Sequence, residues 1–103
     1  MTTKRKDMIR AFKMYYSKDK NAAVIDSKEH KAVENCLFMF KRVKNGTDIL
    51  NAVMEVYINV GGGGKTSERV QCVAAEMFVS DKTVYRFLQK AEEIYIKELE
   101  LLS

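Results

Sequence analysis

Apolar residues recur every three or four positions along most of the chain, which is the spacing of one face of an α-helix. In the segment 4–17 the opposite side is rich in lysine and arginine, and the apolar stripe consists of Met8, Ile9, Phe12, Tyr15 and Tyr16. The polar stretch 17–21 predicts a loop. The alternation of apolar and polar residues that marks a half-buried strand is absent from the sequence. We therefore predict an all-α fold.

A second helix is predicted to begin near Asp26 or Ser27. Asp26 and Glu29 have the spacing of a capping box, in which side chains accept hydrogen bonds from free backbone amides of the first turn. Apolar residues at helical spacing follow, namely Val33, Cys36, Leu37, Phe40 and Val43. Asn45-Gly46 predicts the end of this helix, because glycine adopts the left-handed conformation of a helix end without strain.

A third helix is predicted over residues 47–60, with Thr47 as its cap. Apolar residues cover most of its circumference, which is typical of the buried centre of a bundle. Four consecutive glycines then interrupt the pattern, because glycine is conformationally too free to hold a helix. The predicted architecture is a small bundle of about five helices in three segments: a three-helix segment over 1–60, a glycine link over 61–65, and a helix-turn-helix unit over 66–103.

Length and composition favour one small globular domain. The chain has 103 residues, of which 47% are hydrophobic and 31% charged, and this is too short for more than one ordinary domain. No apolar run approaches the roughly 18 residues of a membrane span, and no segment resembles a signal peptide. Cys36 and Cys72 form no CxxC pair and are predicted to be small core residues. Two unpaired cysteines suit a reducing compartment, so we predict a cytoplasmic protein with no membrane contact.

The charge is unevenly distributed. Residues 1–65 hold 13 of the 18 Lys and Arg but 7 of the 14 Asp and Glu, which leaves +6 there and −2 in residues 66–103. A basic N-terminal half favours polyanions such as nucleic acid.

Residues 67–91 carry the pattern of a helix-turn-helix, in which two short helices pack across a tight turn. The packing needs small or apolar residues at fixed offsets, which are Val70, Val73, Ala74, Met77, Val79, Val84, Phe87 and Leu88. Ser80 stands where a hydroxyl can cap the second helix. Phe78 departs from the pattern, because glycine with a positive φ is most common there. We expect either a looser turn or a Phe78 side chain that covers the core.

The outward side of the second helix is polar and basic. Its predicted base-contacting residues are Lys82, Thr83, Tyr85, Arg86 and Gln89. Contacts to the DNA backbone are predicted for Ser80, Lys90, Lys4, Arg5, Lys6, Arg10, Lys65 and Arg69. Two alternatives stay open. The outward side of the second helix could be an ordinary solvated face, and the basic N-terminus, with Lys13, could be a solubilising surface.

Residues after Lys90 are predicted to leave the DNA. The acids Glu92, Glu93, Glu98 and Glu100 would repel phosphate. Among them runs a further apolar stripe of Ala91, Tyr95, Leu99 and Leu102. Because a small domain needs all the core it can bury, we expect this stripe to pack on the N-terminal helices rather than on a partner chain.

No residue pattern favours catalysis. Gly64-Lys65-Thr66 resembles the end of a phosphate-binding loop, but Asn59 stands where the first glycine is required and no strand precedes it. His30 is predicted to lie on a solvated helix face without partners for catalysis or metal binding. We therefore predict that the protein is not an enzyme and uses no cofactor and no metal.

The segment TSERVQCVAAEMFVSDKTVYRFLQKAEEIYIKEL resembles DNA-binding region 4 of bacterial sigma factors. It is most similar to the small phage-encoded regulators of the ArpU and RinA type. The resemblance rests on Val73-Ala74, Ser80-Asp81-Lys82-Thr83-Val84, Tyr85-Arg86 and Lys90-Ala91, and with the upstream helix it covers residues 46–100. It implies a regulator of phage or prophage late-gene transcription that binds promoter DNA through residues 80–90. The glycine run and Phe78 depart from the family pattern.

The resemblance also implies RNA polymerase as a second partner. The sequence is compatible with a homodimer and with a monomer held by the polymerase. Two other functions stay open: a helical interaction module, such as an RNA polymerase or phage–host adaptor, and a subunit that initiates DNA packaging.

Overall fold

The computed structural model describes residues 3–18, 21–59 and 65–102, with the backbone alone for residues 3 and 4. Within these ranges it contains helices and turns but no strand, which confirms the all-α prediction. The elements are α1 (Thr3–Tyr15), α2 (Ala22–Ile25), α3 (Lys28–Phe40), α4 (Gly46–Val53), the π-helical turn η1 (Met54–Ile58), α5 (Thr66–Met77) and α6 (Asp81–Leu101). The described ranges thus hold six α-helices rather than about five, because the short α2 was not expected. Of the predicted glycine link, residues 61–64 lie outside the described residues.

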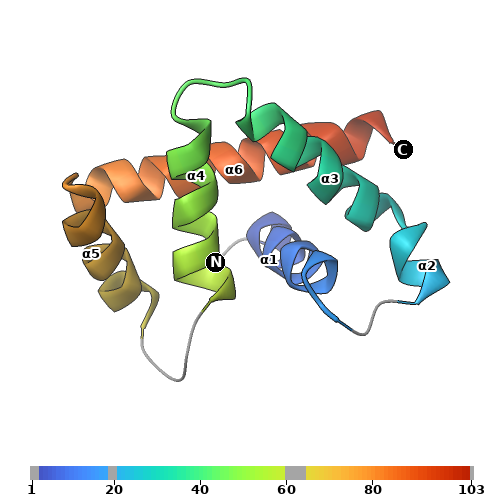
Figure 1. Cartoon of the computed structure of the whole chain (residues 1–103), viewed down its shortest axis with the longest axis horizontal. Coiled ribbons are helices and arrows are strands. Elements are labelled where there is room, and N and C mark those ends of the chain that lie inside the picture. The colour runs from blue at the N-terminus through green and yellow to red at the C-terminus, as the bar shows by residue number, and fades with distance from the viewer. Residues whose placement is uncertain (1–2, 19–20, 60–64, 103) are drawn as a thin grey trace.

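Helix α6 runs along the long axis of the molecule, and α1, α3, α4 and α5 all pack against it (Figure 1). At about 1.5 Å per residue, its 21 residues span about 31 Å of a molecule 38 Å long. Figure 1 shows α5 and α4 at its N-terminal half and α3 and α1 along its C-terminal half. The C-terminal apolar stripe packs on the N-terminal helices as predicted, with Ala91 and Tyr95 buried and Leu99 and Leu102 partly buried.

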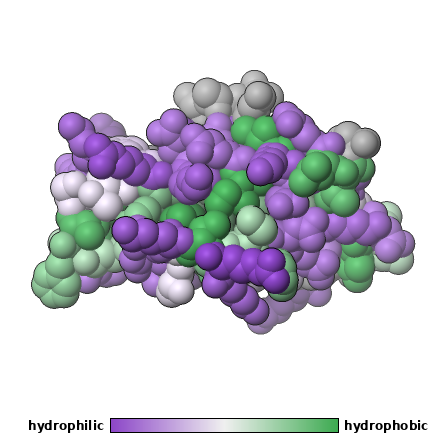
Figure 2. All heavy atoms as spheres, turned by 90° about the horizontal axis from the view of Figure 1, so that it is seen from above, coloured by the Kyte–Doolittle hydropathy of each residue, from purple (hydrophilic) through white to green (hydrophobic). Residues whose placement is uncertain are grey.

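One hydrophobic core joins the segments on either side of residues 60–64. Its largest fully buried side chains are Met8, Phe12, Val33, Cys36, Val53, Val56, Val70, Val84 and Tyr95. Removing one large apolar side chain from water contributes about 1.5–3 kcal/mol, so α1 and α5 are both held to α6 by several such contacts. Seen from above in Figure 2, polar residues cover most of the surface and apolar residues are visible in a band between them.

Ser27, one of the two predicted starts, caps α3. Its Oγ accepts a hydrogen bond from the backbone N–H of His30 at 3.2 Å and donates one to the carbonyl oxygen of Val24 at 2.6 Å. Asp26 does not begin this helix; it is the C-terminal cap of α2. The sequence pattern missed α2 because four residues are too few to show a helical period.

His30 is buried, with 7% of its surface exposed, and not on a solvated face as predicted. Its ring lies against Tyr15 of α1, with the ring centroids 4.7 Å apart. The charged residues beside it in sequence are exposed. The prediction was wrong because α1 covers this side of α3, which the sequence of α3 alone does not reveal.

The turn between α3 and α4 assigns Asn45 and Gly46 roles other than those predicted. Asn45, with φ 62° and ψ 21°, adopts the left-handed conformation expected of Gly46. Gly46 is buried and begins α4, so Thr47 is not the cap. A Cβ atom on Gly46 would collide with the backbone carbonyl of Phe40. Asparagine tolerates the left-handed region, whereas the close approach of the two backbones requires glycine.

We expect Gly46→Ala to destabilise the protein by about 2 kcal/mol or more, because the added methyl group meets backbone that cannot move aside. Urea unfolding followed by circular dichroism measures this free energy. Asn45→Gly is the matched control and should change it by less than about 0.5 kcal/mol, since glycine adopts a positive φ freely. Equal stability of the two variants would contradict the close approach at Gly46.

Tyr95 anchors α6 to α1 through a tilted contact with Phe12, at 6.4 Å between ring centroids. Its side chain is 1% exposed, and its hydroxyl has no hydrogen-bond partner among the described residues. Burial raises the pKa of Tyr95 from 10.0 to about 12, and Glu29, Asp7 and Cys36 add to this effect. The phenol is therefore neutral in the folded protein well beyond the pH at which an exposed tyrosine ionises.

Because the pKa of Tyr95 is higher in the folded state, its contribution to stability is complete below pH 10 and is lost between about pH 10 and 12. We expect Tyr95→Phe to keep the stability at pH 7 or raise it by up to about 1 kcal/mol, because the buried hydroxyl makes no hydrogen bond. The variant should lose less stability than the parent between pH 9.5 and pH 11. Thermal unfolding across this range tests both expectations, and an unchanged alkaline slope would refute the account.

Candidate nucleic-acid interface

Helices α5 and α6 form the predicted helix-turn-helix. The connection is residues 78–80, and the Oγ of Ser80 accepts a hydrogen bond from the N–H of Thr83 at 3.2 Å, which confirms the predicted cap. The inward positions Val70, Val73, Ala74, Val84 and Leu88 are buried, and Met77, Val79 and Phe87 are partly buried against the core. The pattern of small and apolar residues in the sequence therefore located this unit correctly.

Phe78 closes the turn in the left-handed conformation, with φ 58° and ψ 41°. The N–H of Val79 donates to the carbonyl oxygen of Ala74 at 3.0 Å, the bond of a regular glycine-type helix end. The Phe78 side chain is 95% exposed. Both expectations for this residue were wrong, because the turn is tight and the ring does not cover the core.

Replacing Phe78 with glycine should therefore stabilise the protein by about 0.5–1 kcal/mol. The change removes a positive φ from a residue with a Cβ and gives up almost no buried surface. Phe78→Ala keeps the Cβ and should leave the stability within about 0.5 kcal/mol of the parent. The comparison uses chemical denaturation of all three proteins. A Phe78→Gly variant no more stable than Phe78→Ala would contradict the strain assigned to the positive φ, and a Phe78→Ala variant clearly less stable than the parent would show that the ring makes stabilising contacts.

The first three turns of α6 present a polar, exposed side. Lys82, Tyr85, Arg86 and Gln89 are all exposed, and Tyr85 keeps 45% of its surface in contact with solvent. Lys82 and Arg86 are four residues apart and therefore lie on the same side of the helix. These four predicted base-contacting residues thus come together on one surface, which we call the α6 outward face.

The remaining predicted residues of α6 have contacts within the protein. Thr83 is half-buried, with its Oγ1 3.0 Å from the Oγ of Ser80, so its hydroxyl belongs to the helix cap. Lys90 is exposed and its Nζ lies 4.0 Å from the Oε2 of Glu93. Exposed pairs of this kind contribute little, and Lys90 is still able to turn toward another anion.

An ion pair joins α1 to α6. The Nε of Arg5 lies 3.1 Å from the Oε2 of Glu92, whose side chain is 13% exposed. Glu92, predicted to repel phosphate, is therefore compensated by a cation from another helix. Tyr85 and Glu92 are seven residues apart and share one side of α6, so the N-terminal part of α1 borders the α6 outward face.

Three of the predicted backbone-contacting residues line one hollow between α1, η1 and α5: Lys6, Arg10 and Arg69. Lys13 lines it as well, from the next turn of α1. Lys65 is exposed at the start of α5, outside this lining, and the side chain of Lys4 lies outside the described residues. Arg69 is half-buried, and its Nη1 donates to the carbonyl oxygen of Val56 at 3.4 Å.

Tyr57 and Thr66 also line this hollow, although neither was predicted as a site residue. The predicted helix over 47–60 becomes the π-helical turn η1 after Val53, closed by a hydrogen bond from the N–H of Asn59 to the carbonyl oxygen of Met54 at 2.6 Å. Val56 and Tyr57 are both buried on this turn. No sequence signal marks such a turn, so the position of Tyr57 could not be found from its spacing.

The two cysteines differ in their surroundings. Cys36 is buried as predicted, and burial, with Glu98 as a second cause, raises the pKa of its thiol to about 12. Cys72 is exposed on α5, so its prediction as a core residue was wrong. Among the described residues, no group of three or more His, Cys, Asp or Glu side chains could hold a metal ion. None of the helices in the described part of the chain combines the length and apolar character needed to cross a membrane.

The sequence matches no protein-family model, no curated protein and no solved structure at a significant level. The similarity to ArpU- and RinA-type regulators therefore stays a prediction that rests on the residues of the helix-turn-helix.

Proposed function

We propose that this protein binds double-stranded DNA in the cytoplasm as a sequence-specific transcriptional regulator of phage or prophage late genes. The observation that carries the proposal is the α6 outward face. This face presents two positively charged side chains, an amide and a phenol on the second helix of a helix-turn-helix. Ser80 caps the first turn of that helix. A helix in this position enters the major groove with its N-terminal residues at the base edges.

In this proposal each side chain has a role that follows from its chemistry. Arg86 and Lys82 donate to the acceptor atoms of guanine, and Gln89 forms paired hydrogen bonds with adenine. Tyr85 lies on the flank nearest Arg5 and contacts the sugar–phosphate backbone or a base. Lys6, Arg10 and Lys65 supply positive charge that holds the duplex in register. Arg5 acts indirectly, by holding α1 against α6 through Glu92.

The proposal is tested by selecting bound DNA from a random pool at two salt concentrations. An enriched sequence that persists at the higher salt is expected. Arg86→Glu should then lower the affinity for the selected site at least about tenfold, because a bidentate base contact contributes about 1–3 kcal/mol. The matched control is Lys97→Glu, an equal charge change at an exposed position further along α6, with an expected loss of about threefold or less.

Uniform, salt-sensitive retention of the whole pool would contradict sequence-specific binding, because it reflects charge attraction alone. Equal affinities of Arg86→Glu and Lys97→Glu would contradict the role of the α6 outward face.

The exposed Phe78 ring favours a second candidate function, an adaptor that binds RNA polymerase or another protein. A bulky apolar side chain in a left-handed conformation gains nothing from the fold itself, whereas an aromatic ring is a common anchor of protein interfaces. A binding assay with purified RNA polymerase tests this function. It is supported if the parent protein retains the polymerase, the Phe78→Gly variant does not, and neither protein retains DNA.

A further inference from the structure

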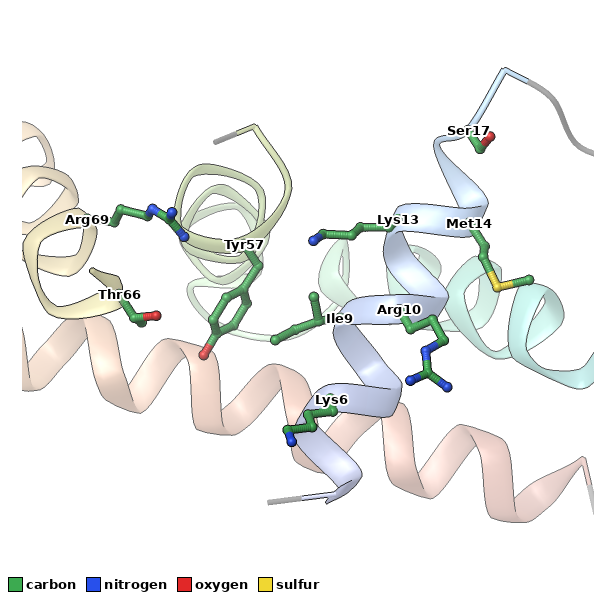
Figure 3. A pocket seen from close by; sticks show the side chains of 9 residues that line it. All are labelled: Lys6, Ile9, Arg10, Lys13, Met14, Ser17, Tyr57, Thr66 and Arg69. Atoms are coloured by element: carbon green, nitrogen blue, oxygen red, sulfur yellow. The ribbon is translucent and has the colours of Figure 1, made fainter. Parts of the chain in front are cut away.

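The hollow between α1, η1 and α5 has a volume of about 720 Å³ and concentrates positive charge (Figure 3). Lys6, Arg10 and Lys13 come from α1 and Arg69 from α5, and none of the lining residues in the described part of the chain carries a carboxylate. In Figure 3, Lys13 and Arg69 extend toward each other from opposite walls, with Tyr57 between them. Lys6 lies on the same side of α1 as Lys13, whereas the guanidinium of Arg10 is directed away from Tyr57 and Arg69. Like charges that face one hollow repel one another, so an anion placed between Lys13 and Arg69 would be favoured.

The donors that surround the hollow suit a phosphate group. The described hydrogen bond of Arg69 to Val56 uses one N–H of a guanidinium, which has five donors in a planar fork that matches phosphate oxygens. Lysine ammonium groups bind phosphate as point charges. Thr66 and Tyr57 add hydroxyl groups, and Figure 3 shows both side chains directed into the space between α5 and α1.

The surroundings of Tyr57 keep its hydroxyl protonated and connect the hollow with α6. Burial raises the pKa of Tyr57; Arg5 lowers it, while Glu92 and Tyr85 raise it further. The nearby acid Glu92 is paired with Arg5. The Arg5–Glu92 ion pair joins α1, which forms one wall of the hollow, to α6, although no residue of α6 lines the hollow itself.

We propose that this hollow is a phosphate-binding site, occupied by a phosphate of the DNA backbone or by the phosphates of a free nucleotide. A volume of this size accommodates a phosphate with an attached sugar. The DNA form of the inference rests on the proposed function, because the duplex would lie on the α6 outward face at the same time. The nucleotide form is independent of it.

The first experiment titrates the full chain with sodium pyrophosphate at constant ionic strength, followed by NMR of the backbone amides. Saturable shifts confined to the amides around Ile9, Lys13, Tyr57 and Arg69 are expected. Lys13→Glu should weaken binding about tenfold, because it removes a charge-assisted contact and adds repulsion. Lys6→Glu is a second test variant at an exposed position and should act like Lys13→Glu. The control is Lys31→Glu, an equal charge change at an exposed position on α3, which should alter pyrophosphate binding less than twofold.

The second experiment measures the affinities of ATP and of a short DNA duplex for the same variants. If the site binds the DNA backbone, Lys13→Glu weakens duplex binding. It also makes the decrease of log K with log salt less steep, by about one in the slope. If it takes a nucleotide, ATP binds more tightly than pyrophosphate and duplex binding is unaffected. Pyrophosphate, ATP and duplex affinities that are equal in Lys13→Glu and Lys31→Glu would overturn the inference.

The outcome is separable from that of the proposed function. A protein that binds pyrophosphate in the hollow but no duplex would refute DNA binding and leave the phosphate site standing. Conversely, a duplex affinity that depends on Arg86 but not on Lys13, without pyrophosphate or ATP binding, would refute the phosphate site alone.

Discussion

Burial of one continuous side of α6 is the interaction on which the rest of the structure depends. Val84, Leu88, Ala91 and Tyr95 are buried along this side, and α6 packs against α1, α3, α4 and α5. A helix with one side fixed by its core contacts has its opposite side fixed as well, because the helical period is constant. The positions of Lys82, Arg86 and Gln89 thus follow from the packing of the opposite side of the same helix.

The sequence predicted the elements whose signals are local. The cap at Ser80, the inward row from Val70 to Leu88 and the apolar period of α3 all depend on residues within a few turns of one another. The same locality explains the errors. His30 and Cys72 were placed from their neighbours in sequence, whereas burial is decided by what packs against a helix. Asn45 has the left-handed conformation predicted for Gly46, and the requirement for glycine at position 46 comes from the approach of the Phe40 backbone, which the sequence does not reveal.

The candidate site divides in a similar way. Residues of the α6 outward face could be predicted together, because they share one helix. The hollow could not be predicted, because its cations come from two helices, α1 and α5, and Tyr57 comes from a π-helical turn that has no sequence signature. The prediction that the acids after Lys90 would repel phosphate treated Glu92 as an isolated charge, whereas it is paired with Arg5, a residue 87 positions away in sequence. Pairing between distant segments is the information that a single sequence lacks.

The central claim is that the α6 outward face is the surface that meets DNA. NMR mapping of the full chain with a selected duplex tests it most directly, because each backbone amide reports contact at its own position. The account predicts the largest changes at residues 82–90, extending across the α1 border near Arg5 but not to the exposed residues of α3. Changes centred on α3, with residues 82–90 unaffected, would contradict it.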